Sequence, residues 1–126
     1  MKLKNTDSDR RNGPCKETFR DGKLSGAGRY SNGKKTGLWK YYFRNGRLKA
    51  TGKYSGGQLD GPWKWYRENG EPLQAGRFKG GKQLGLWKRY HDSGKLWDVG
   101  KYLDGEKIGV WKYYDKHGKL RRTETR

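Results

Sequence analysis

Side chains with the chemistry of catalysis or metal binding are few in this sequence, and they are not grouped. Two imidazoles, His91 and His117, and one thiol, Cys15, could act as base, nucleophile or metal ligand. Cys15 is far along the chain from both histidines, and no spacing supplies either histidine with Asp or Glu partners for a metal. We therefore predict that both histidines are turn residues and that the chain has no metal site.

The carboxylates do not form a pattern either. A paired-carboxylate site would require them to recur in register. They do not, as is seen for residues such as Asp60, Glu68, Glu71, Asp92, Asp98, Asp104 and Glu106. No Gly-x-x-x-x-Gly-Lys-Ser/Thr phosphate loop occurs. The sequence therefore predicts no catalytic residues and no cofactor, so we do not expect an enzyme.

One arrangement of polar side chains does recur, and its chemistry is anion binding. A Lys is followed two residues later by a Tyr at Lys40 and Tyr42, Lys64 and Tyr66, Lys88 and Tyr90, and Lys112 and Tyr114. In one interpretation the Tyr rings pack on one another, the Lys stems cover them, and the ammonium groups stay in water. In the other, the eight side chains form a repeated anion-binding strip. We name them as the candidate binding residues.

These pairs belong to a repeat with a period of 24 residues. The same period relates Trp39, Trp63, Trp87 and Trp111, and also the glycines two residues before each Trp. The repeat domain covers 13–126 as units 13–36, 37–60, 61–84 and 85–108 with a partial fifth unit at 109–126, and residues 1–12 form a polar leader expected to be disordered. The first unit has Cys15 and Thr18 where the others have Trp and Tyr, as in a terminal capping repeat.

Each unit is predicted to be a pair of strands. The ring-rich run 38–43 reads as one strand, residues 44–46 as a turn ending in an Asn-Gly pair, and 47–54 as the returning strand. Gly52, Gly76 and Gly100 inside the returning strands indicate either a bulge or a close contact between a ring and the backbone. The predicted fold is all-β: an elongated antiparallel β-hairpin solenoid of about five repeats.

Alternation along a strand separates the side chains into two faces. Trp39 should share one face with Tyr41 and Phe43, while Lys40 and Tyr42 point to the other. Because Trp buries the largest area, the four repeated Trp residues should form the buried structural ladder. The Lys and Tyr residues would then form a row of cations interleaved with rings on the opposite face.

Composition supports a thin, ring-filled fold with a strongly basic surface. Only 29% of the chain is hydrophobic, yet it contains six Trp and nine Tyr. The 31 Lys and Arg exceed the 13 Asp and Glu by 18 charges, which attracts nucleic acid, anionic lipid or an acidic protein. No stretch has the character of a signal peptide or a membrane span, and the single Cys agrees with a reducing compartment, so we expect a cytoplasmic protein.

The unit Gly-x-Trp-Lys-x-Tyr-x-x-x-Gly-x-Leu-x-x-x-Gly-Lys-Tyr-x-x-Gly resembles a MORN repeat, in the variant common among bacterial YwqK-like antitoxins. The resemblance covers residues 13–126. It implies a β-hairpin solenoid, a non-enzymatic interaction scaffold and, through the antitoxin label, a cognate toxin as protein partner. It supplies no catalytic residues.

Three kinds of partner remain open at this stage. The resemblance favours an antitoxin or immunity-type scaffold that binds an acidic toxin. The basic strip with its rings is also suited to sequence-independent binding of nucleic acid, and physical reasoning alone places this second hypothesis first. The third is docking on an anionic phospholipid surface. The sequence does not fix the oligomeric state or the face that binds.

Overall fold

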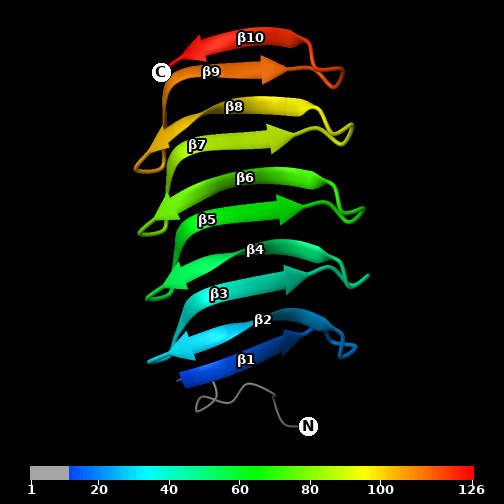
Figure 1. The fold of residues 1–126 in the computed structure, drawn as a ribbon, viewed down its shortest axis with the longest axis vertical. Helices are drawn as coiled ribbons and strands as arrows, with labels where there is room; N and C mark the ends of the chain where they lie inside the picture. The colour runs from blue at the N-terminus through cyan, green and yellow to red at the C-terminus, as the bar shows by residue number, and fades with distance from the viewer. Residues whose placement is uncertain (1–11) are drawn as a thin grey trace.

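The computed structural model describes residues 12–126 and contains one sheet of ten antiparallel strands joined in sequence order. The strands are β1 (Asn12–Thr18), β2 (Leu24–Ser31), β3 (Lys34–Tyr42), β4 (Leu48–Ser55), β5 (Gln58–Tyr66), β6 (Pro72–Lys79), β7 (Lys82–Tyr90), β8 (Leu96–Leu103), β9 (Glu106–Tyr114) and β10 (Leu120–Thr125). They follow one another along the long axis, with β1 and β10 at opposite ends (Figure 1). The predicted hairpin solenoid is confirmed. Within 12–126 no helix could span a membrane.

Five hairpins correspond to the five predicted units. Of the predicted leader at 1–12, residues 1–11 lie outside the described part of the chain and Asn12 is the first residue of β1. The first strand of the second unit, predicted over 38–43, is longer at its start and ends at Tyr42. Phe43 therefore belongs to the turn, where its backbone N–H donates to the Arg47 carbonyl at 2.9 Å. Because Phe43 lies outside β3, the strand geometry does not test the expectation that it shares a face with Trp39.

Two kinds of turn alternate along the sheet. At one edge, two-residue turns join the hairpins to one another, and the tip residues at Asn32 and Asp104 have φ of 52° and 50°. At the other edge, a longer turn closes each hairpin with a bond such as Gly46 N–H to Phe43 carbonyl at 2.9 Å. Side chains connect successive long turns: Asn45 donates to the Glu68 carbonyl at 3.0 Å and Arg67 to the Tyr90 carbonyl at 2.8 Å. Each repeat thus fixes the position of the next.

Every junction between hairpins contains a bulge with a glycine at positive φ. In β5, Gly61 has φ of 77°, and the register passes from Gly52 opposite Trp63 to Lys53 opposite Asp60. Only glycine takes this conformation without a steric cost, and bulges increase the local twist. The bulge therefore lies on the strand opposite Gly52, two residues before the Trp. The equivalent glycines are Gly37, Gly85 and Gly109, with φ of 66°, 72° and 70°.

Candidate binding surfaces

The tryptophan face, the sheet face bearing Trp39, Trp63, Trp87 and Trp111, holds the buried core. These four residues are 0%, 2%, 4% and 2% exposed. Each ring lies flat on a glycine of the preceding strand: a Cβ added to Gly52 would stand 2.2 Å from Trp63 Cδ2. The indole N–H of Trp63 also donates to the Lys53 carbonyl at 2.9 Å. The predicted Trp ladder is confirmed, and the close ring-on-backbone contact is the reason for Gly52, Gly76 and Gly100.

Other rings extend the ladder into a continuous aromatic layer. Tyr41 stacks between Trp39 and Trp63, with centroid distances of 5.8 Å and 6.4 Å. Tyr54 meets the edge of Trp63 at 5.3 Å, and Phe78 meets Trp87 in the same way at 5.1 Å. Aromatic contacts of this kind add about 0.5–1.5 kcal/mol each beyond the area they bury. A single sheet of low aliphatic content is therefore stabilised by rings that pack laterally across strands.

A lysine covers the terminal Trp at each end of this ladder. The Lys35 ammonium lies 4.5 Å from the Trp39 ring centroid and donates to the Tyr41 hydroxyl at 2.8 Å. Lys107 takes the same place over Trp111 at 4.6 Å and donates to Tyr113 at 3.1 Å. Cation–π contacts explain why charged side chains are compatible with this otherwise apolar face. Neither lysine was predicted from the sequence, although they stand four residues before the first and last repeated Trp.

Burial raises the pKa of two tyrosine hydroxyls on the tryptophan face. The hydroxyl oxygens of Tyr41 and Tyr54 are hydrogen-bonded at 2.8 Å. Burial raises the pKa of Tyr54 above its ordinary value, and the hydrogen bond to Tyr41 raises it further. Burial also raises the pKa of Tyr41, against the lowering effect of the bond to Tyr54. Both groups are neutral at physiological pH.

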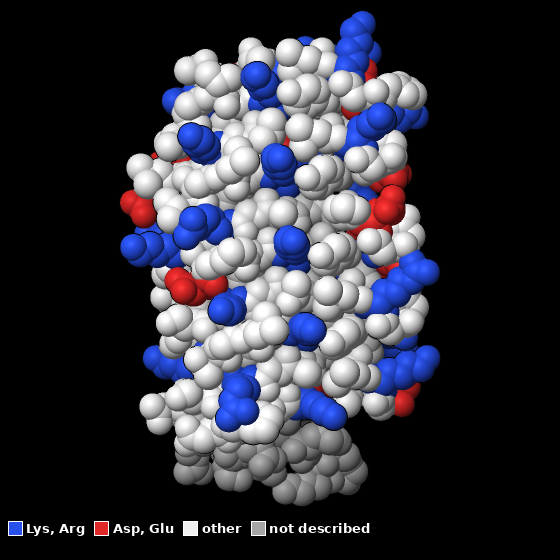
Figure 2. Space-filling view, viewed as in Figure 1, with Lys and Arg blue, Asp and Glu red and all other residues white. Residues whose placement is uncertain are grey.

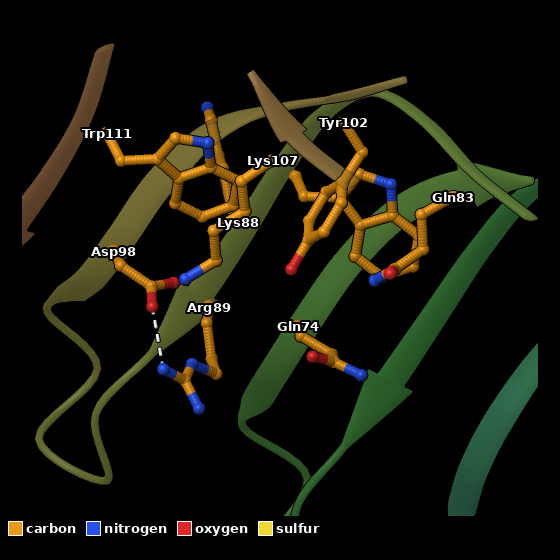
Figure 3. Close-up of a pocket in the computed structure, with 9 residues that line it drawn as sticks. Gln74, Gln83, Lys88, Arg89, Asp98, Tyr102, Lys107 and Trp111 are labelled. Atoms are coloured by element: carbon orange, nitrogen blue, oxygen red, sulfur yellow. Dashed lines mark hydrogen bonds and ion pairs between the residues drawn. The ribbon is translucent and has the colours of Figure 1, made fainter. Parts of the chain in front are cut away.

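A polar hollow interrupts the aromatic layer toward the last repeats. It has a volume of about 230 Å³ (Figure 3) and is lined by Gln74, Gln83, Trp87, Lys88, Arg89, Asp98, Tyr102, Lys107 and Trp111. Arg89 stands in the column that holds rings in the other Trp-bearing repeats, and it donates to the buried Asp98 carboxylate at 2.7 Å. Its guanidinium also stacks 3.8 Å above Trp97. From the sequence alone Asp98 is a carboxylate outside any pattern, because its partner Arg89 is on the neighbouring strand.

The lysine face is the opposite sheet face, defined by a row that crosses all ten strands. Direct strand pairs connect Lys16, Ala27, Lys40, Thr51, Lys64, Ala75, Lys88, Val99, Lys112 and Thr123 in this order. Every lysine in the row is exposed. Because successive lysines lie on alternate strands, two inter-strand distances apart, their spacing along the sheet is about 10 Å. The sheet thus presents cations at regular intervals.

A second row of cations runs beside the first. It consists of Arg29, Lys53, Arg77 and Lys101, all of them exposed. Figure 2 shows a face on which basic side chains form two columns along the long axis, with the acidic side chains mostly toward the margins. None of these four residues, nor Lys40, Lys64, Lys88 or Lys112, takes part in the ion pairs found within residues 12–126. Their charge is therefore available to an external partner.

The predicted tyrosines lie in a row of their own on this face. Tyr42, Tyr66, Tyr90 and Tyr114 are half-buried and pair with Leu48, Pro72, Leu96 and Leu120 of the next strand. The neighbours of each repeated lysine in the ladder are Ala, Thr or Val. Cations and rings thus form adjacent rows and are not interleaved. The structure brings the four lysines together as one row and the four tyrosines as another.

The histidines and the thiol remain apart. His91 and His117 lie in long turns of the fourth and fifth hairpins, as predicted. The His91 ring is 2.7 Å from the Tyr114 carbonyl and stacks on Trp97. Cys15 is buried in β1 beside Tyr30 and Trp39. Within the described residues, no group of three or more His, Cys, Asp and Glu side chains could hold a metal ion.

The structure is a repeated hairpin. Packed aromatic rings cover one face of its sheet, and regularly spaced basic side chains line the other. These features define a repeat scaffold. Its sequence matches the family model for the MORN repeat variant at 35–55, 59–79, 83–104 and 107–125, and the chain belongs to this family. Family membership indicates a binding or scaffolding role. No curated protein matches the chain.

Among solved structures, the crystal structure of TarM is similar to this chain, with 12% sequence identity and a TM-score of 0.45. The similarity covers 93% of this chain and 20% of the TarM chain. The present chain therefore spans about a fifth of the length of that relative.

Proposed function

We propose that this chain is a non-catalytic binding scaffold whose lysine face binds an acidic protein partner, with toxin neutralisation as its specific role. One observation carries the proposal: eight exposed cations lie in two adjacent rows and take part in none of the ion pairs found within residues 12–126. They are Lys40, Lys64, Lys88 and Lys112 in one row and Arg29, Lys53, Arg77 and Lys101 in the other. Such a surface attracts an acidic partner at long range and sets its orientation. The resemblance to YwqK-like antitoxins supports the toxin as that partner. A cytoplasmic location, expected from the sequence, would allow the two to meet.

The position of the rings favours a protein over single-stranded nucleic acid. Stacking on bases requires exposed ring faces beside the cations. The four Trp rings are buried on the other side of the sheet, and the tyrosines of the lysine face are half-buried. Binding of nucleic acid would then depend on charge alone, with the steep salt dependence of phosphate contacts.

A second candidate, the anionic membrane surface, is favoured by exposed apolar side chains on the lysine face. Leu38, Leu86 and Val110 are 52%, 50% and 54% exposed and pair with Lys53, Lys101 and Thr125 of neighbouring strands. Where apolar and basic side chains lie side by side, the basic groups can contact anionic lipid headgroups while the apolar groups contact the acyl chains. The same combination also fits a protein interface, which is why the test must separate the two.

The experiment reverses charge on the lysine face and compares a matched control. The face variant is Lys64→Glu with Lys88→Glu; the control is Arg20→Glu with Lys116→Glu, which makes the same charge change at exposed turn residues. Proteins cross-linked to each chain in its native host are then identified. We expect a protein that the wild type and control retain, that the face variant loses, and whose toxicity the wild type suppresses on co-expression.

A membrane or a nucleic acid as the partner would give different results with the same three proteins: the wild type, the face variant and the control. Flotation with phosphatidylserine vesicles in preference to phosphatidylcholine vesicles, lost in the face variant, would indicate the membrane. Binding to single-stranded oligonucleotides that falls steeply with salt would indicate nucleic acid. Equal recovery of the partner by the face variant and by the control would refute the role of the lysine face.

A further inference from the structure

The polar hollow on the tryptophan face lies where the layer of rings is interrupted. Between Trp39 and Trp63 the ring of Tyr41 lies at centroid distances of 5.8 Å and 6.4 Å. Between Trp63 and Trp87 the ring of Trp65 lies at 5.8 Å and 5.7 Å. Two consecutive junctions of the ladder thus have the same construction, one planar ring between two tryptophans.

Arg89 has the corresponding place between Trp87 and Trp111, and its charged group is turned aside. The guanidinium stacks 3.8 Å from the centroid of Trp97 and donates to Asp98 at 2.7 Å. The hollow of about 230 Å³ is lined by both Trp87 and Trp111. An apolar cavity of about 150 Å³ is enough for benzene. The hollow therefore has room for one aromatic ring with small substituents.

Polar side chains lie at both ends of the hollow. Figure 3 shows Arg89 and Asp98 at one end, and it shows Tyr102 and Gln83 at the other. The Arg89 side chain is 41% exposed, and its bond to Asp98 leaves further N–H donors that can bind a carboxylate. On this face Arg89 and Lys107 contribute two positive charges to the lining and Asp98 one negative charge. This balance favours a ligand with a single negative charge.

The second unit shows which group suits the end opposite Arg89. The Tyr41 hydroxyl is hydrogen-bonded to the Tyr54 hydroxyl at 2.8 Å and accepts a hydrogen bond from Lys35 at 2.8 Å. Two units later, Tyr102 stands in the column of Tyr54. Gln83 stands in the column of Lys35. A ligand hydroxyl in the place of the Tyr41 hydroxyl can therefore bond to the Tyr102 hydroxyl and to the Gln83 amide.

We propose that the hollow binds a small hydroxyaryl carboxylate, a single ring with a carboxylate at the Arg89 end and a hydroxyl group opposite. The ring lies between Trp87 and Trp111, in the place that Tyr41 has in the second unit. A ligand of this size predicts a dissociation constant of about 0.1–1 mM. The hollow and the lysine face are on opposite sides of the sheet, so failure of either proposal leaves the other standing.

Isothermal titration calorimetry of the full chain tests the chemistry of the ligand, with para-hydroxybenzoate as the probe. Three comparison ligands each lack one feature: benzoate lacks the hydroxyl, phenol the carboxylate, and cyclohexanecarboxylate the planar ring. We expect each to bind about tenfold more weakly than the probe, because each loses one interaction. Equal affinity for phenol or for cyclohexanecarboxylate, or no saturable binding up to about 10 mM probe, would overturn the proposal.

Filling the hollow with a ring of the chain itself tests the location. Arg89→Tyr with Asp98→Ala reproduces the directly opposed pair of Tyr41 and Ala50, so this variant should fold. We expect it to lose binding of para-hydroxybenzoate completely. Far-ultraviolet circular dichroism verifies the fold, and retained binding by the folded variant would overturn the proposal.

A milder substitution tests the hydroxyl contact. Tyr102→Phe introduces the residue that Phe78 provides one unit earlier, so the fold accepts it. It should weaken binding of para-hydroxybenzoate about tenfold and leave binding of benzoate unchanged. The matched control, Tyr54→Phe, makes the same change outside the hollow and should affect neither ligand. An equal effect of Tyr102→Phe on both ligands would contradict the proposed orientation.

Nuclear magnetic resonance distinguishes the hollow from attraction of the carboxylate to the basic surface. The probe should shift the indole N–H signals of Trp87 and Trp111 and leave that of Trp39 in place. Shifts confined to the backbone amides of the lysine face, such as those of Lys40 and Lys64, would indicate binding by charge alone. That result would overturn the proposal.

Discussion

The contact between Gly52 and Trp63 predicts that adding a single methyl group changes stability in opposite directions in two backgrounds. The Cβ of Gly52→Ala would stand 2.2–2.4 Å from three atoms of the Trp63 ring. Gly52 does not have the positive φ of the turn glycines, so alanine fits the backbone itself. The only obstacle is the ring, which must leave its position.

The cost follows from what the displaced ring loses. Trp63 is 2% exposed, bonds to the Lys53 carbonyl, and contacts three other rings at 5.3–6.4 Å. Overpacking costs about 1–3 kcal/mol, and complete loss of a buried Trp about 3–5 kcal/mol. We therefore expect Gly52→Ala to lower the free energy of unfolding by about 3 kcal/mol.

The assay is a double-mutant cycle by urea unfolding, followed by far-ultraviolet circular dichroism. Trp63→Leu removes the indole that lies on Gly52, and in this background Gly52→Ala should raise stability by up to about 1 kcal/mol, because alanine restricts the unfolded chain more than glycine does. The coupling free energy is then about 3–4 kcal/mol, the difference between the two effects. An equal loss of stability in both backgrounds would refute the reasoning, since it would place the requirement for glycine in the backbone.

Two further predictions concern ionisable groups on the tryptophan face. Asp98→Asn should lower the free energy of unfolding, measured in urea, by about 1–2 kcal/mol, because it removes a charged hydrogen bond to the partly exposed Arg89. A change within about 0.5 kcal/mol, as expected for an ordinary surface substitution, would contradict this prediction. Burial raises the pKa of Tyr54 in the folded state above its value of about 10 in the unfolded chain. The contribution of the protonated hydroxyl to the free energy of unfolding is therefore fully present below about pH 10 and is lost as the pH rises further. The free energy of unfolding should fall more steeply between about pH 9 and about pH 11 in the wild type than in Tyr54→Phe, and parallel slopes would count against it.

The features that depend on one strand could be predicted from the sequence. The 24-residue spacing of Trp and Gly identified the hairpins and their number, and alternation assigned Trp39 and Lys40 to opposite faces. These properties repeat in every unit, so each repeat confirms the others. The predicted bulge or close contact at Gly52 was also correct in its second form.

The features that depend on neighbouring strands could not be predicted. The bulge at Gly61 shifts the register, and this shift determines which side chains of β4 and β5 meet. The Arg89–Asp98 pair and the separate rows of lysine and tyrosine arise from such pairings. They also occur where one unit departs from the others, as Arg89 does in a column of rings. A consensus pattern built from all the units does not contain a residue that occurs in only one of them.

Stability and binding can therefore vary independently in this fold. Each Trp requires a glycine on the preceding strand, so a change on the tryptophan face must be matched across two repeats. Lys40, Lys64, Lys88 and Lys112 are exposed and have small or β-branched neighbours in their row, so replacing them leaves the ring contacts intact. Exposed substitutions usually change stability by less than about 0.5 kcal/mol. If a partner binds the lysine face as we propose, that partner can change without loss of the fold, and loss of binding after charge reversal there reports on recognition.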